Sequence, residues 1–205
     1  MKIAIIGTGN VGSALAKKWA SAGHDIFLGV RDINNFKGQA LLQIPGVAVF
    51  EIEEAVQKAD IILMAVPAGI AAQAAVSLGD TTGKIIIDTM NIIMGRGPQG
   101  YSSTTAAILD HTQTRDVVKC FNTTGYNNMQ YTLYDGIPLD MFVAGDSIKG
   151  KEAAQKLAAH AGFGVCYDIG GNDKFELMEQ FAWFWINLAM FQGQGREIGF
   201  KLLKR

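Results

Sequence analysis

The sequence predicts an α/β fold: a Rossmann-type, doubly wound and mainly parallel sheet that is followed by a long C-terminal helix. Short apolar runs rich in Ile and Val alternate with helical stretches through the first half of the chain, which is the order of a parallel sheet with helices on both faces. A glycine-rich turn follows the first run, and an apolar helical pattern covers residues 173–192. Because the 205 residues contain no long linker, we expect residues 1–205 to form a single domain.

The elements follow from the local patterns in chain order. Apolar runs predict strands, and runs with helical spacing predict helices between them, several of which end at glycine. The predicted strands are residues 2–6, 26–28, 47–50, 61–66, 84–87, 117–121, 141–144 and 165–168. The predicted helices are residues 11–22, 51–59, 68–78, 104–109, 149–161 and 173–191. Residues 95–103 are rich in Gly, Pro and Ser and are expected to form a loop.

Charge and hydropathy exclude several classes of protein. The formal net charge is −1, so there is no overall basic field to attract nucleic acid or acidic lipid. The longest apolar stretch, residues 61–76, is interrupted by Pro67, Gly69 and Gln73 and is too short to span a bilayer. Met1 leads directly into a strand, without the pattern of a signal peptide. We therefore expect a cytoplasmic protein that engages neither membranes nor nucleic acid.

The first turn carries the pattern G-x-G-x-x-G in the context that the pattern requires. It comprises Gly7, Thr8, Gly9, Asn10, Val11 and Gly12, follows a strand and opens a helix. Gly7 permits the tight turn, Gly9 lets a pyrophosphate approach the main chain, and Gly12 lets the helix pack on the strand. The helix N-terminus offers free N–H groups to phosphate. The turn therefore predicts dinucleotide binding, the alternative being an ordinary glycine-rich turn without a ligand.

The end of the second strand favours NADP over NAD. An NAD site usually has an acidic residue there to hold the ribose hydroxyls, but this strand ends in Gly29 and Val30. Arg31 follows, and a guanidinium can pair with the 2′-phosphate of NADP; the hydroxyl of Thr8 offers a further donor. Asp32 lies 20 residues after Gly12, the distance of a ribose-binding acid, although its place beyond the strand suggests that it caps the next turn. The sequence therefore leaves open whether Arg31 holds a 2′-phosphate or Asp32 holds the ribose hydroxyls.

Three further strand ends should meet at the same edge of the sheet, where open α/β sheets bind their ligands. The first, Ala65, Val66 and Pro67, is expected beside the nicotinamide. Asn91 offers an amide to a carboxamide or a substrate carbonyl, and so does Asn122, which Thr123 and Thr124 follow. The alternative is that these polar side chains only satisfy loop backbone, which we prefer for Asp88.

These segments resemble a known family. The glycine turn, residues 22–24 and 29–31, the strand before Pro67, residues 119–124 and the C-terminal residues 192–203 look like NADP oxidoreductases of the coenzyme F420 (deazaflavin)-dependent type. The resemblance spans nearly the whole chain, and the cytosolic domains of six-transmembrane metalloreductases share the layout. It implies hydride transfer between NADP(H) and a flavin-like or deazaflavin acceptor, with a flavin or coenzyme F420 as co-substrate.

The resemblance also implies roles for single residues. Thr8 and Arg31 would contact the 2′-phosphate, and Val66 and Pro67 would lie beside the nicotinamide. Asn122, Thr123 and Thr124 would form part of the acceptor site. The deazaflavin-dependent enzymes have a His where this sequence has Asn122, which leaves the identity of the acceptor open.

No catalytic acid–base pair and no metal-ligand cluster is evident, so we assign no catalytic residue. Direct hydride transfer needs alignment of two rings more than proton transfer. We expect His24 to be structural and His160 to be solvated; a catalytic role for His111, which follows the loop region, is the less favoured alternative. Two other functions remain: an imine or β-hydroxyacid reductase acting as a dimer, and a non-catalytic NADP sensor.

The C-terminal helix has apolar residues on more than one face. They are Phe175, Met178, Phe181, Phe184, Trp185, Leu188 and Phe191. This surface allows three interpretations: packing on the core, a homodimer interface, or a wall of the acceptor pocket.

Overall fold

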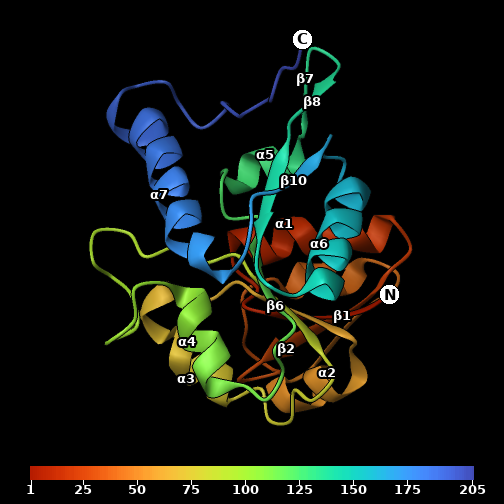
Figure 1. Ribbon diagram of the computed structural model, residues 1–205. Helices are drawn as coiled ribbons and strands as arrows, with labels where there is room; N and C mark the ends of the chain where they lie inside the picture. The colour runs from red at the N-terminus through yellow and green to blue at the C-terminus, as the bar shows by residue number, and fades with distance from the viewer.

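The computed structural model describes residues 1–205 and shows one large sheet between two layers of helices (Figure 1). Its eight strands lie in the order β10-β9-β6-β5-β4-β1-β2-β3. The first six strands along the chain therefore have the order 3-2-1-4-5-6 of the dinucleotide-binding fold, with the reversal of strand order between β1 and β4. The predicted Rossmann-type, mainly parallel sheet is confirmed. The strands are β1 Lys2–Ile6, β2 Asp25–Val30, β3 Val47–Glu51, β4 Ile61–Met64, β5 Ile85–Asp88, β6 Val117–Cys120, β9 Met141–Ala144 and β10 Cys166–Asp168.

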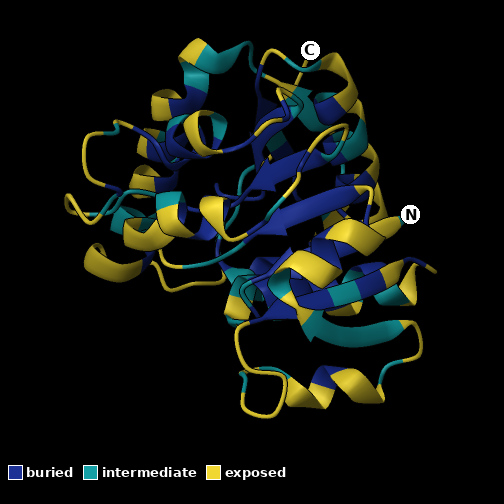
Figure 2. Cartoon of the chain, turned by 90° about the horizontal axis from the view of Figure 1, so that it is seen from below, coloured by how far each residue is buried: buried dark blue, intermediate teal, exposed yellow.

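The helices cover the two faces of the sheet because each presents an apolar stripe to it. On one face, α1, α5 and α6 bury residues such as Trp19, Met129 and Leu157; on the other, α2, α3 and α4 bury Val56, Ala75 and other small apolar residues. Figure 2 shows the buried strands between helices whose outer surfaces are exposed. The helices are α1 Asn10–Ser21, α2 Ile52–Lys58, α3 Ala71–Val76, α4 Thr104–His111, α5 Tyr126–Gln130, α6 Ile148–Ala161 and α7 Phe175–Ile186. No helix in the structure combines the length and the apolar character that a membrane crossing requires.

Four regions differ from the predicted elements. A 3-10 helix that was not predicted, Gln39–Gln43, precedes β3, and the predicted helix over 68–78 is a 3-10 turn, Ala68–Ile70, followed by α3. The segment between β6 and β9 contains α5 and a small hairpin, β7 Leu133–Tyr134 with β8 Ile137–Pro138, which are too short for a periodic pattern to show. The chain returns to the edge of the sheet at which β6 ended, so β9 runs antiparallel to β6. The predicted helix over 173–191 begins as a short 3-10 turn, Asn172–Lys174, and its last turn, Asn187–Phe191, is π-helical.

The C-terminal residues after α7 return across the molecule towards the hairpin (Figure 1). The carboxylate of Asp140, just before β9, accepts hydrogen bonds from the Lys201 ammonium at 2.7 Å and from the Leu202 amide at 2.9 Å. The Ile198 carbonyl accepts from the Trp185 indole at 2.7 Å and from the Asn128 amide at 2.6 Å. The Trp185 bond joins α7 to the C-terminal segment, and the Asp140 bonds join that segment to the start of β9.

A histidine pair lies at the start of β2, away from the edge of the sheet where the parallel strands end. A ring nitrogen of His24 lies 2.8 Å from one of His160, and the N-terminal ammonium lies 3.1 Å from the other nitrogen of His24. The prediction of a structural His24 fits this place, and His160 is exposed, as expected, while one of its ring nitrogens also faces His24. Burial, followed by the positive N-terminus and His160, lowers the pKa of His24.

This lowered pKa predicts how stability depends on pH. Below about pH 6.5, His24 binds a proton more readily in the unfolded chain than in the folded protein. The free energy of unfolding is therefore greatest above that pH and decreases as the pH is lowered through it. Urea unfolding between pH 5 and 8 should show the decline, and His24→Gln should flatten it. His111→Gln, which removes an exposed histidine of α4, is the matched control; equal slopes in all three proteins would refute the assignment.

Candidate functional site

The glycine turn between β1 and α1 has the geometry that the sequence predicts for phosphate binding. Gly7 has a left-handed backbone, φ +103°, and an added Cβ would lie 2.4 Å from the Ala65 carbonyl oxygen at the end of β4. A Cβ on Gly12 would lie 2.0 Å from the Gly7 carbonyl oxygen. A Cβ on Gly9, in contrast, meets nothing within 4 Å. Gly7 and Gly12 are therefore required by packing, whereas Gly9 keeps an approach to the backbone open from outside.

The N-terminus of α1 is free to receive an anion. No side chain caps it, and its first turn contains no acidic residue. The first N–H groups of a helix have no partner within the helix, and they carry the positive end of its dipole. Asn10 and Val11, the first two residues of α1, thus lie at a position that favours a phosphate group.

Arg31 and Asp32 follow the end of β2 and differ in the contacts that their side chains form. The Asp32 carboxylate accepts a hydrogen bond of 2.9 Å from the Asn34 backbone amide and so caps the following turn, as expected. The exposed Arg31 is in none of the ion pairs of the structure. Thr8 is buried beneath the segment after β2, with its Cβ 3.2 Å from the ideal Cβ position of Gly38. Both side chains are exposed, and of the two only Arg31 has no partner in the structure.

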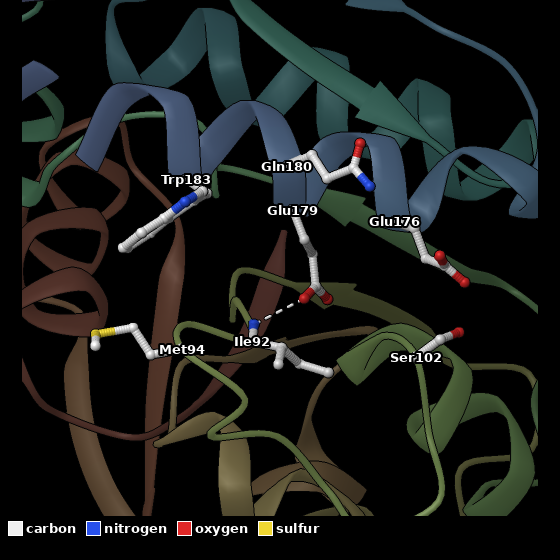
Figure 3. A pocket seen from close by; sticks show the side chains of 7 residues that line it. All are labelled: Ile92, Met94, Ser102, Glu176, Glu179, Gln180 and Trp183. Carbon is white, nitrogen blue, oxygen red and sulfur yellow. Dashed lines mark hydrogen bonds between the residues drawn. The ribbon is translucent and has the colours of Figure 1, made fainter. Parts of the chain in front are cut away.

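Two shallow cavities adjoin each other at the ends of β4 and β5. One, of about 270 Å³, contains two of the predicted site residues, Pro67 and Asn91; its lining is Pro67, Ala68, Gly69, Asn91, Ile93, Met94 and Arg96. The other, of about 340 Å³, lies between α7 and the loop after β5; its lining is Ile92, Met94, Ser102, Glu176, Glu179, Gln180 and Trp183 (Figure 3). Met94 lines both and forms the boundary between them.

Met94 holds this place through a strained backbone. It has φ +52°, and Gly95 has φ +72°. The Arg96 amide donates to the Ile93 carbonyl at 3.1 Å, which completes a tight turn with two left-handed central residues. Such a turn normally has Asn, Asp or Gly at the position of Met94, and a bulky residue there is an outlier. The turn therefore projects an apolar side chain, 73% exposed, between the two cavities.

A buried ionic cluster positions α7 above the strand ends. Lys119 of β6 is fully buried, and its ammonium lies 2.8 Å from the Asp88 carboxylate and 2.9 Å from the Glu179 carboxylate of α7. Glu179 also accepts from the backbone amides of Ile92 at 2.7 Å and Thr104 at 3.0 Å. The cluster thus joins β5, β6, α4 and α7, and Figure 3 shows Glu179 reaching across the cavity floor to Ile92.

Sequence reasoning missed the role of Lys119 and Glu179, although a signal was present. Lys119 interrupts the apolar run Val117–Cys120, and a lysine in a strand that is covered on both faces must be paired. Asp88 has the structural role expected of it: its carboxylate accepts from the Met90 amide at 2.8 Å and from the hydroxyls of Thr104 and Thr105 at 2.6 Å.

Asn91 and Asn122 are brought together as a pair. The Asn91 side-chain amide donates to the Asn122 carbonyl at 3.0 Å, and the Asn122 amide donates to Asn91 Oδ1 at 2.9 Å and to the Met178 carbonyl of α7 at 3.1 Å. Asn122 Oδ1 is buried and is the one buried side-chain polar atom without a hydrogen bond. Phe121, with φ +60°, turns the chain at this point. An unsatisfied acceptor next to a strained residue is a feature that requires an explanation, and functional sites are where both accumulate.

The other residues predicted at this edge lie as follows. Ala65 and Val66 extend β4, the Ala65 amide donating to the Ile6 carbonyl at 2.8 Å. The Thr123 hydroxyl is buried and faces the sulfur of Met141 at 3.6 Å. The Thr124 hydroxyl accepts from the Asn128 amide at 2.7 Å. Asn122, Thr123 and Thr124 line neither cavity, so their contact with an acceptor stays a prediction.

The apolar residues of the C-terminal helix differ in burial, and core packing is the one expected role that the structure shows. Phe175, Met178 and Trp185 are buried against the body of the protein, as expected for core packing. Phe184 and Phe191 are 52% and 61% exposed. The cavity wall is formed by Trp183 and Glu179, which the aromatic pattern did not single out.

Comparison with known proteins agrees with this geometry. Residues 2–92 match the family of NADP oxidoreductases that depend on coenzyme F420. The matched part contains β1 to β5, the glycine turn, Arg31 and Asn91. The predicted resemblance is confirmed over this part of the chain, and the family that it matches is one of NADP-dependent oxidoreductases.

Solved structures show the same fold over the whole chain. One from Arthrobacter sp. FB24, assigned as an F420-dependent NADP reductase, is 23% identical with a TM-score of 0.83, and the alignment covers 100% of both chains. An imine reductase from Myxococcus stipitatus in complex with NAD+ has a TM-score of 0.69 at 15% identity, covering 94% of this chain and 63% of that chain. A reductive aminase from Aspergillus terreus in complex with NADPH has a TM-score of 0.67 at 15% identity, covering 94% and 63%. This chain spans less than two thirds of the length of these two enzymes.

Proposed function

We propose that this protein is an NADP-dependent oxidoreductase that transfers hydride between NADPH and a flavin-like or deazaflavin acceptor. The observation that carries the proposal is the continuous edge from the open face of Gly9, past Pro67 and Asn91, to the cavity beneath α7. A dinucleotide that has its pyrophosphate at the glycine turn extends its nicotinamide towards the reversal of strand order. The cavity beneath α7 then adjoins the reactive end of the cofactor.

The residues present fit NADP(H). The open space over Gly9 admits a pyrophosphate, the N-terminus of α1 stabilises its charge, and the exposed, unpaired Arg31 suits a 2′-phosphate. Thr8 is buried against Gly38, so its contact with that phosphate stays a prediction. Asn122 Oδ1, which lacks a donor, lies next to Asn91 at the nicotinamide end. When bound, the reduced nicotinamide supplies a hydride, which carries both electrons to the acceptor ring and leaves NADP+.

The protein contributes positioning and exclusion of water rather than acid–base chemistry. Pro67 presents apolar surface in one cavity and Met94 at the junction of the two, where two rings would have to meet face to face. The Lys119–Glu179 ion pair fixes the height of α7 above that junction. No residue is assigned a proton-transfer role, in agreement with a reaction whose chemistry belongs to the cofactor.

Arg31→Ala tests the choice of cofactor. Removal of a charge-assisted contact should weaken NADPH binding by about 1–3 kcal/mol and leave NADH nearly unchanged. Calorimetric titration with both nucleotides measures this, and Asp32→Asn is the paired variant. An equal loss for both nucleotides in Arg31→Ala would exclude a 2′-phosphate contact, and a loss of NADH binding in Asp32→Asn would transfer the ribose contact to Asp32.

An imine or β-hydroxyacid reductase is the second candidate, and one observation favours it. The imine reductase with the same fold is longer than this chain, so a comparable site would require a second subunit. The exposed apolar residues of α7 and of the π-helical turn after it, Leu177, Phe184, Met190 and Phe191, offer a surface for a homodimer. We propose a homodimer through this surface and a cytoplasmic location, as the sequence predicts.

Turnover separates these functions from the third, a non-catalytic NADP sensor. NADPH oxidation is followed at 340 nm with riboflavin, FMN and a cyclic imine as acceptors. Oxidation by flavins supports the proposed function, and oxidation by the imine alone supports the second candidate. Tight NADPH binding without oxidation by any of them supports a sensor.

A further inference from the structure

The cavity between α7 and the loop after β5 has a lining that indicates what kind of acceptor it takes. For brevity we call it the α7 slot; its residues are Ile92, Met94, Ser102, Glu176, Glu179, Gln180 and Trp183. We propose that the α7 slot is the acceptor site and that it selects a flat acceptor which is neutral or positively charged and carries hydrogen-bond donors. This inference rests on the proposed function and specifies the class of its second substrate.

The position of the slot follows from its boundary. Met94 is shared with the cavity that contains Pro67 and Asn91, where the nicotinamide is expected. Ile92 and Ile93, consecutive residues, line the slot and the neighbouring cavity, respectively. A molecule in the slot therefore lies next to the nicotinamide position, and the exposed, flexible Met94 side chain between them must move aside for the two rings to come into contact.

The two ends of the slot differ in character. In Figure 3, Trp183 and Met94 face each other at one end, whereas Glu176 and Ser102 lie at the other. Trp183 is 37% exposed, so part of its indole ring is available for stacking on a planar ligand. A flat ring would therefore lie at the Trp183–Met94 end, which is the end that adjoins the nicotinamide, with its polar substituents towards Glu176 and Ser102.

The charge of the slot determines which substituents it accepts. No lysine or arginine lines it. The Glu179 carboxylate is engaged by Lys119 and two backbone amides, but Glu176 is exposed and forms no ion pair in the structure. Arg96 lines the neighbouring cavity instead. A carboxylate can only accept hydrogen bonds, so the polar end favours N–H donors or a cation and repels a phosphate or a carboxylate.

Riboflavin and FMN test this charge selection, because they share one ring system and differ in a phosphate. With NADPH saturating and at low ionic strength, kcat/KM should be about tenfold higher for riboflavin than for FMN. Glu176→Gln should reduce that ratio to about threefold or less, and added salt should do the same in the unmodified protein. Glu152→Gln, which removes an equal charge from the exposed side of α6, is the control and should leave the ratio unchanged.

A second pair of variants tests the place of binding without requiring turnover. Trp183→Ala should weaken the binding of both flavins to the NADP+ complex about tenfold, measured by quenching of flavin fluorescence, while NADPH affinity stays the same. Trp183→Phe should restore most of the loss. Val76→Ala, which shortens an exposed apolar residue of α3 outside the slot, is the control and should have no effect.

The outcomes separate this inference from the proposed function. Turnover with FMN equal to or faster than riboflavin, or flavin binding that is unchanged in Trp183→Ala, overturns the inference and leaves hydride transfer intact. Flavin binding that depends on Trp183 and Glu176, without any NADPH oxidation, upholds the slot as the ligand site and overturns the proposed function.

Discussion

Gly9→Val is expected to abolish NADPH binding in a protein that remains folded. The backbone of Gly9, at φ −73° and ψ −162°, is accessible to any residue, and an added Cβ meets no protein atom within 4 Å. The valine side chain would instead occupy the space that the pyrophosphate needs, and several charge-assisted hydrogen bonds to backbone amides would be lost. Affinity should fall at least about 100-fold, whereas stability should change by no more than about 0.5 kcal/mol.

Calorimetric titration with NADPH and thermal unfolding of the same samples measure the two effects. Gly12→Ala is the contrasting variant: its Cβ would lie 2.0 Å from the Gly7 carbonyl oxygen, so it should lose stability as well as binding. If Gly9→Val is folded and binds NADPH as tightly as the unmodified protein, the glycine turn has no role in cofactor binding.

Lys119→Met is expected to have the largest effect on stability. It leaves two carboxylates without their cation: that of Asp88, which is fully buried, and that of Glu179, which is 6% exposed. Removing one partner of a buried ion pair costs about 3–5 kcal/mol, a large part of the 5–15 kcal/mol that typically stabilises a domain. Urea unfolding of both proteins gives the difference directly.

A triple variant identifies the cause of that loss. Lys119→Met combined with Asp88→Asn and Glu179→Gln removes the uncompensated charge and should recover part of the stability. The NADPH affinity of the folded fraction should change little in either variant, because the cluster lies under α7 and not at the glycine turn. A loss below about 1 kcal/mol for the single variant would show that the ion pair contributes little.

The strands and the glycine turn could be predicted because their signals are local. The apolar runs at residues 3–6 in β1, 61–64 in β4 and 85–87 in β5 mark strands that are covered on both faces, and Gly7, Gly9 and Gly12 are spaced as the turn requires. The hairpin β7–β8 and α5 escaped prediction, since two to five residues are too few for any period to appear. The π-helical end of α7 escaped it as well, because its packing and not its residues sets the local winding.

By itself, the sequence determined the Rossmann-type sheet and the glycine turn, since each depends on neighbours within a few residues or on strand order, and it predicted Arg31 as the phosphate contact. Only the tertiary structure decided which polar side chains meet. It placed Asn91 against Asn122 and Glu179 against Lys119, pairs that are 31 and 60 positions apart. It also placed Met94 between two cavities. Contacts of this kind depend on how helices and loops pack on the sheet, and spacing along the chain carries no record of that packing.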